Sequence, residues 1–182
     1  MCRIALATSV LLFTLLAFIS SNALAEVFQE VPGQKFHFDM DTRDGAFSEW
    51  RHDDLASVSA LRATLEFQRL GKHEKWLPGS RILVTTSDGD YGISLTADHS
   101  KPPMRMALVR KEGWGTGSIK NIAVGERITI EMDWSHSNLL LIRLGDGQPY
   151  ELALTSPVKG LYFSASTGEL TVHSLVLGRM VP

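Results

Sequence analysis

Alternation of apolar and polar residues is the dominant pattern along the chain after residue 35. In "KFHFDM" the side chains of Phe36 and Phe38 fall on one side, and similar alternation marks "ISLTA" from Ile93, "MRMALVR" from Met104 and "LTVHSLVLG" from Leu170. Stretches rich in Gly, Pro, Asp or Ser, among them "LPGS", "SDGD", "GDGQP" and "STGE", lie between such segments. Short alternating runs separated by turn residues predict an all-β fold, a sandwich or barrel of about nine or ten strands.

The segment "ASVSALRATLEFQRL" (56–70) fits two secondary structures. A helix would place Leu55, Val58, Leu61 and Leu65 on one side. A strand would place Leu61, Ala63, Leu65 and Phe67 on one face and polar residues on the other. The two-residue period over 61–68, with β structure on both sides, favours the strand.

A hairpin is predicted over "ITIEMDWSHSNLLLIRLGDG" (128–147). The even positions from Ile128 to Trp134 share the apolar face, and Glu131 lies on the polar face. Pairing Ile130 with Ile142 keeps apolar residues together and places Glu131 diagonal to Arg143. A shift by one residue would set Arg143 on the apolar face, which is unfavourable. The simplest interpretation is a structural hairpin with an outer ion pair.

Four tryptophans fall in different contexts. Parity predicts that Trp134 points into the core, and Trp50 and Trp76 are expected to cover the sandwich near strand ends. Trp114 differs because glycines surround it in "EGWGTGS". Its indole could stack on a sugar ring, or it could fold back as a lid over the edge of the core.

If Trp114 does bind a ligand, Tyr91, Lys111 and Glu112 are the polar side chains expected beside it.

The first 25 residues have the features of a secretory signal peptide. Arg3 precedes an apolar run from Ile4 to Ile19, and "SSNALA" ends in Ala23-Leu24-Ala25, a small-x-small cleavage pattern. We therefore expect cleavage before Glu26 and an exported, periplasmic or secreted domain over 26–182, with no stable membrane insertion after cleavage. The alternative is an uncleaved anchor, although the run is short for a spanning helix.

Charge and cysteine content narrow the classes of partner and site. The formal charge is −2, and loss of Arg3, the only charged residue of the leader, would leave −3. The absence of a basic block argues against nucleic acid as a partner. Cys2 is the only cysteine, so residues 26–182 have neither a disulfide nor a thiolate metal site.

An acidic cluster in "DMDTRDG" raises the question of calcium. Asp39, Asp41 and Asp44 lie close in sequence, but Arg43 holds a position at which a calcium loop needs an acid. A turn stabilised by aspartate side chains is the favoured interpretation. No cofactor is expected, and calcium at these three aspartates stays a weak alternative. The six histidines are scattered without ligand spacing, so zinc is not expected.

The hairpin and its flanks resemble a known superfamily. "VGERITIEMDWSHSNLLLIRLGDGQPYELAL" is similar to the core hairpin of laminin G-like domains in the concanavalin A-like lectin/glucanase superfamily, and "FHFDMDTRDGAFSEW" and "GELTVHSLVLG" fit its neighbouring first and last strands. The resemblance implies one antiparallel β-sandwich of concanavalin-like jelly-roll type over 26–182. The resemblance also keeps weak calcium binding at a loop edge as an alternative.

The same strand also resembles the catalytic strand of family-16 glycoside hydrolases. Those enzymes carry Glu-x-Asp-x-x-Glu, in which the two glutamates are nucleophile and acid/base. Glu131 and Asp133 match the first two acids, whereas His136 stands at the third. Since the chemistry divides two roles between two carboxylates, this departure weakens the match.

The leading functional prediction is a non-catalytic binding module for a carbohydrate or a cell-surface partner. Two alternatives stay open: a carbohydrate-active hydrolase or lyase that uses Glu131 and Asp133, and a structural or subunit-contact domain that binds another extracytoplasmic protein. Because the fold hosts many functions, the resemblance by itself does not choose among them.

Overall fold

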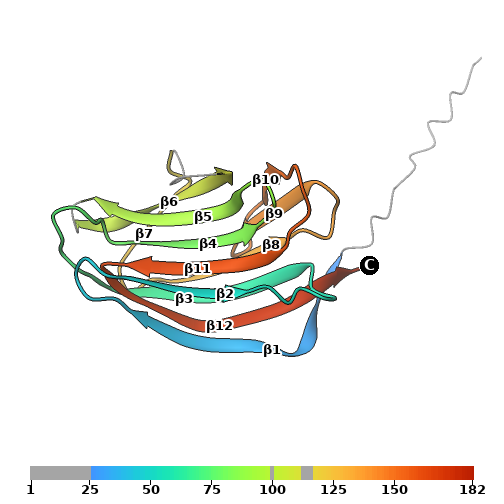
Figure 1. The fold of residues 1–182 in the computed structure, drawn as a ribbon, viewed down its shortest axis with the longest axis horizontal. Helices are drawn as coiled ribbons and strands as arrows, with labels where there is room; N and C mark the ends of the chain where they lie inside the picture. The colour runs from blue at the N-terminus through green and yellow to red at the C-terminus, as the bar shows by residue number, and fades with distance from the viewer. Residues whose placement is uncertain (1–25, 99–100, 112–116) are drawn as a thin grey trace, which may run out of the picture.

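The computed structural model describes residues 26–98, 101–111 and 117–182, and the predicted leader lies outside these ranges. The described chain forms twelve strands (Figure 1): β1 (Val27–Asp41), β2 (Phe47–His52), β3 (Ala60–Leu70), β4 (Gly79–Thr85), β5 (Asp90–Asp98), β6 (Lys101–Lys111), β7 (Lys120–Ile122), β8 (Arg127–Asp133), β9 (Leu139–Leu144), β10 (Tyr150–Ala153), β11 (Gly160–Ser166) and β12 (Gly168–Val181). The predicted number was lower, because strands as short as β7 and β10 show no period. No helix in this part of the chain is long and apolar enough to span a membrane.

The strands form two six-stranded antiparallel sheets. Sheet A has the order β1-β12-β3-β8-β9-β10, and sheet B has the order β2-β11-β4-β5-β6-β7. The first and last strands, β1 and β12, are paired and lie side by side along the lower edge of Figure 1. The antiparallel sandwich and the pairing of its terminal strands, both predicted from the sequence, are confirmed.

Residues 60–70, for which a helix was the alternative, form the central strand β3. Leu61, Ala63 and Leu65 are completely buried, as the strand interpretation predicts. β3 pairs with β12 on one side and with β8 on the other, so both of its edges are hydrogen-bonded.

The β8–β9 hairpin has the predicted faces but a different register. Ile130 pairs with Leu144 rather than with Ile142, and Glu131 lies directly opposite Arg143 instead of diagonal to it. The predicted pairing is therefore wrong by two residues. In the structure residues 134–138 connect β8 to β9, and the backbone N–H of Trp134 donates to the carbonyl of Ser59, which precedes β3, at 2.8 Å. A shift of two residues leaves every side chain on its face.

The inner faces of the two sheets form a continuous apolar core. At one edge an aromatic cluster joins the sheets, with Phe36 and Phe38 from β1, Trp50 from β2 and Phe163 from β11. The rings of Phe38 and Trp50 stack with centroids 5.3 Å apart, and Phe163 meets Trp50 edge-on at 5.5 Å. The predicted core position of Trp134 and the covering role of Trp50 are confirmed, since both are partly buried against the core.

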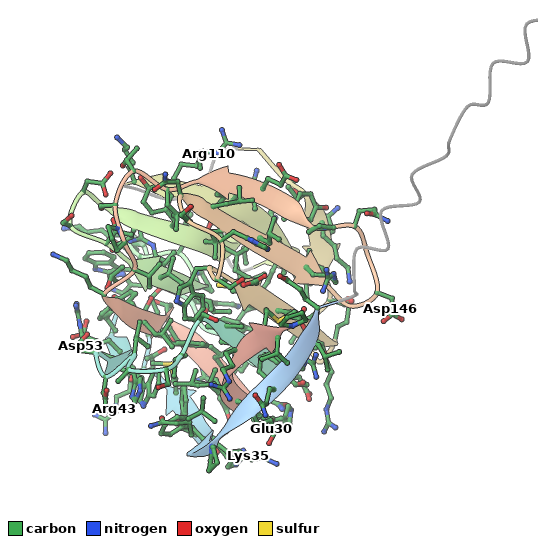
Figure 2. The ribbon with its side chains drawn as sticks, turned by 90° about the vertical axis from the view of Figure 1, so that its right-hand side faces the viewer. Glu30, Lys35, Arg43, Asp53, Arg110 and Asp146 are labelled. Carbon is green, nitrogen blue, oxygen red and sulfur yellow. The ribbon has the colours of Figure 1, made fainter. Side chains whose placement is uncertain are left out.

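Charged residues, in contrast, project from the outside of the sandwich. Figure 2 shows this for Glu30 and Lys35 on β1 and for Arg43, Asp53 and Asp146 in loops, all of which are exposed.

Replacing Phe163 by alanine tests the aromatic cluster. Phe163 is completely buried, and its truncation is expected to lower the free energy of unfolding by about 3–5 kcal/mol because a large core side chain leaves a cavity. The measurement is urea unfolding followed by fluorescence. Val27→Ala is the control, since Val27 is 59% exposed. Equal midpoints for the two variants would contradict this account of the core.

Candidate functional site

Glu131, the first predicted catalytic acid, lies between two arginines on the outer face of sheet A. Its side chain is 12% exposed. One carboxylate oxygen accepts from Arg62 of β3 at 2.7 Å, and the other accepts from Arg143 of β9 at 2.5 Å. Both oxygens are therefore engaged in ion pairs that link three adjacent strands.

Asp133, the second predicted acid, is 5% exposed at the end of β8. Its Oδ1 accepts the backbone N–H of Ser135 at 2.8 Å, which stabilises the turn into β9. His136 is exposed in that turn, with its Nε2 3.4 Å from Oε2 of Glu26. Glu26, Asp133 and His136 offer ligand atoms within 4.8 Å of one another, and they are the group in the described chain that could hold a metal ion.

The aspartates considered for calcium are arranged differently. Arg69 Nη2 lies 3.0 Å from Asp41 and Arg69 Nη1 lies 3.8 Å from Asp44, so both carboxylates face a cation. Asp39 is an exposed residue of β1 opposite Thr171. In the described residues these three aspartates form no metal-binding group.

The residues predicted to surround a ligand at Trp114 are dispersed or outside the described chain. Trp114 and Glu112 lie outside it. Tyr91 is 2% exposed in the core, which leaves its ring no surface for a ligand, and its hydroxyl donates to Asp88 at 3.2 Å. Lys111 lies 3.9 Å from the same carboxylate.

Asp88 accepts hydrogen bonds that connect two neighbouring loops. It accepts hydrogen bonds from Ser156 in the β10–β11 connection and from Thr86. These bonds, with Ser156 contributing most, lower the pKa of the Asp88 carboxyl. Tyr91 and Lys111 thus belong to a structural network.

A groove on the outer face of sheet B is the candidate site that the described residues offer. Ile82 and Val84 of β4 point into the core, so Arg81 and Leu83 point outward. Across the sheet, Ser166 pairs with both Phe47 and Gly79, Gly79 with Thr96, and Thr96 with Arg105. Small side chains at the centre of this row leave a cavity of about 590 Å³ above the sheet. We call it the sheet-B groove; its lining is Phe47, Lys75, Trp76, Leu77, Arg81, Thr96, Arg105, Tyr162 and Ser166.

The connection between β3 and β4 forms one wall of the sheet-B groove. Ser166 Oγ donates to the carbonyl of Leu77 at 2.9 Å, and the N–H of Ala97 donates to the carbonyl of Pro78 at 3.0 Å. The N–H of Gly71 donates to Thr167 at 2.8 Å. These bonds hold the connection against the sheet and place Trp76 at the rim.

Exposed apolar side chains gather at this groove. The large apolar residues of the described chain with high exposure are Val27, Phe47, Trp76 and Leu77, and all except Val27 line the groove. Trp76 is 59% exposed, so the expectation that it covers the core is wrong. It lies in the polar β3–β4 connection, where its backbone N–H donates to Nδ1 of His73 at 3.2 Å. A contiguous exposed apolar patch commonly marks an interaction site.

The outer face of sheet B also concentrates groups with shifted pKa values. Burial lowers the pKa of the Arg81 guanidinium and raises those of the Tyr162 hydroxyl and the Asp90 carboxyl. The hydrogen bond with Glu49 raises the pKa of Arg51, whose guanidinium lies 4.7 Å from the centre of the Tyr162 ring. Such clustering of partly desolvated ionisable groups is typical of functional surfaces.

The sequence alone does not predict this groove. Its residues come from β2, β4, β5, β6, β11 and the β3–β4 connection, and only the sheet order brings them together. The one local signal is the tryptophan in "HEKWLPGS", where polar and turn residues surround a large aromatic side chain.

No protein-family model matches the chain, and none of the curated proteins matches it in sequence. Matches to solved structures exist at low identity. The galectin LEC-6 of Caenorhabditis elegans is 15% identical, with a TM-score of 0.46, over 79% of this chain and 95% of that one. The carbohydrate-binding module CBM66 of Bacillus subtilis is 10% identical, with a TM-score of 0.42, over 81% and 93%. A Bacillus licheniformis β-glucanase is 11% identical, with a TM-score of 0.45, over 71% and 70%.

The fold of the described chain is an antiparallel β-sandwich of two six-stranded sheets. Likeness at these identities concerns the fold alone and says nothing of ligand or activity.

The ion pairs of Glu131 predict a structural role that can be measured. Glu131→Gln is expected to lower the free energy of unfolding by about 1–3 kcal/mol, because hydrogen bonds to charged groups are lost and the new amide N–H groups face donors. Glu151→Gln, on an exposed position of β10, is the matched control. Unchanged urea midpoints for Glu131→Gln would contradict the structural assignment.

Asp88 predicts a pH-dependent contribution to stability. Because its folded pKa lies below the ordinary value of 3.8, the ionised form stabilises the fold above that pH, and this contribution is lost as the pH falls through the folded pKa. Asp88→Asn is therefore expected to melt below the unchanged protein at pH 7 and to approach it in acid. Melting curves between pH 7 and 2.5 measure the difference. A gap that stays constant over that range would contradict the prediction.

Proposed function

We propose that this protein is a non-catalytic glycan-binding module whose ligand occupies the sheet-B groove. The observation that carries the proposal is the exposure of Trp76, Phe47 and Leu77 at a groove whose other lining residues are polar. The faces of aromatic rings pack against the apolar C–H faces of sugars. Guanidinium and hydroxyl groups, here those of Arg81, Arg105 and Thr96, bind sugar hydroxyls.

The dimensions of the groove suit a short stretch of polysaccharide. The row from Phe47 to Arg105 crosses five strands, which spans about 19 Å at the usual spacing between strands. The cavity volume of about 590 Å³ falls within the range of small-molecule sites. A glycan segment that lies across the strands would contact both the aromatic and the cationic groups.

The chemistry of the lining supports binding rather than hydrolysis. Glycoside hydrolysis usually requires two carboxylates that flank the scissile bond. The described lining of the groove includes neither Asp nor Glu. Together with the predicted leader, this leads us to propose an exported module that binds glycans outside the cytoplasm.

Trp76→Ala tests the proposed function. The variant is expected to lose glycan binding by at least about tenfold, since stacking on an aromatic face contributes on the order of 1–1.5 kcal/mol and the apolar contact area is lost as well. The melting temperature should change little, because the side chain is 59% exposed. A glycan array on residues 26–182 identifies the ligand, and titration calorimetry measures the affinity.

Val27→Ala is the matched control, because Val27 has the same exposure but lies on β1 of sheet A. Equal affinities of Trp76→Ala and the unchanged protein for the identified glycan would overturn the placement of the site. Absence of binding to every glycan on the array would overturn the proposed function.

A further inference from the structure

The charged residues that line the sheet-B groove are all cationic. Lys75 comes from the β3–β4 connection, Arg81 from β4 and Arg105 from β6, and the described lining holds no acidic residue. These cations approach the groove from three separate elements. This arrangement contrasts with the chain as a whole, whose formal charge is −2.

Arginines on the outer face of sheet A are matched by acids. Arg62 and Arg143 share Glu131, and Arg127 lies 2.9 Å from Glu66. Around the groove the pattern changes, since in the described chain no carboxylate lies within ion-pair distance of Lys75 or Arg105. Exposed salt bridges are therefore common on the outer face of sheet A, whereas Lys75 and Arg105 keep their charges available to a ligand at the groove.

Arg81 lies at the centre of the groove floor, between the strand neighbours Ser164 and Ser94. Its guanidinium is partly withdrawn from water, as the burial-lowered pKa indicates, and Asp90 attracts it from outside the groove lining. A guanidinium in a partly desolvated setting binds a carboxylate or sulfate with a charge-assisted, often bidentate, pair of hydrogen bonds.

From these contacts we infer that the sheet-B groove selects anionic glycans, those that carry carboxylate or sulfate groups. The inference rests on the proposed function and adds the class of saccharide. Trp76 and Phe47 contact the apolar faces of the sugar rings, while Arg81, Arg105 and Lys75 bind the acidic groups. Carboxylate and sulfate offer the same chemistry to a guanidinium, so the experiment separates them.

The test compares ligands that differ only in charge. Polygalacturonate is compared with its fully methyl-esterified form, and dextran sulfate with dextran, by titration calorimetry against residues 26–182. Binding to an anionic member is expected to be at least about tenfold tighter than to its neutral counterpart, because charge-assisted hydrogen bonds are replaced by neutral ones. Which anionic polymer binds distinguishes uronate from sulfate.

Substitutions distinguish specific binding in the groove from non-specific electrostatic attraction to the protein surface. Arg105→Gln and Lys75→Gln remove exposed cations of the groove and should each reduce the preference for the anionic polymer by about fivefold or more, with melting temperatures unchanged. Arg179→Gln removes an exposed arginine of β12 on sheet A and should leave the preference intact.

Each outcome has a distinct consequence. Equal binding of charged and neutral partners would overturn the inference and leave the proposed function standing. Equal loss in Arg179→Gln and Arg105→Gln would also overturn it, as would binding to single-stranded oligothymidylate but to none of the polysaccharides. Failure to bind any polysaccharide would count against the proposed function itself.

Discussion

Packing of the inner face of sheet A against the inner face of sheet B is the constraint on which the rest of the molecule depends. Side chains alternate along each strand, so burial of Leu61 and Leu65 on β3 and of Ile82 and Val84 on β4 decides what lies outside. The described chain contains no cysteine, and the aromatic cluster around Phe163 ties the sheet edges by apolar contact. The packed inner faces therefore fix which side chains each outer face presents to a ligand.

The outer faces of the two sheets carry different kinds of side chains. On sheet A, long charged side chains lie opposite one another, and Glu131 is saturated by two arginines. On sheet B, Gly79, Ser166 and Ser164 leave a hollow that longer neighbours surround. A small residue on a strand makes fewer packing contacts on that face. It leaves space in which a ligand can lie close to the backbone. The difference explains why one face is a structural surface and the other a candidate site.

Local pattern was sufficient to predict the sandwich, the strand at 60–70 and the partnership of Glu131 with Arg143, because a two-residue period fixes faces. The hairpin register could not be predicted in this way, because a shift of two residues keeps every side chain on its face, so the two-residue period fits both pairings. The local pattern could not predict the groove either. Phe47, Trp76 and Arg105 are far apart in sequence, and the order of strands in sheet B decides that they meet.

Mapping of ligand contacts by nuclear magnetic resonance tests the central claim most directly. A glycan that binds residues 26–182 should shift the indole resonance of Trp76 and the backbone amides of Thr96 and Ser166, while resonances of β8 stay in place. Shifts confined to Glu131, Asp133 and their neighbours on sheet A, with Trp76 unchanged, would contradict the account. Such shifts would locate the ligand at the predicted catalytic strand instead.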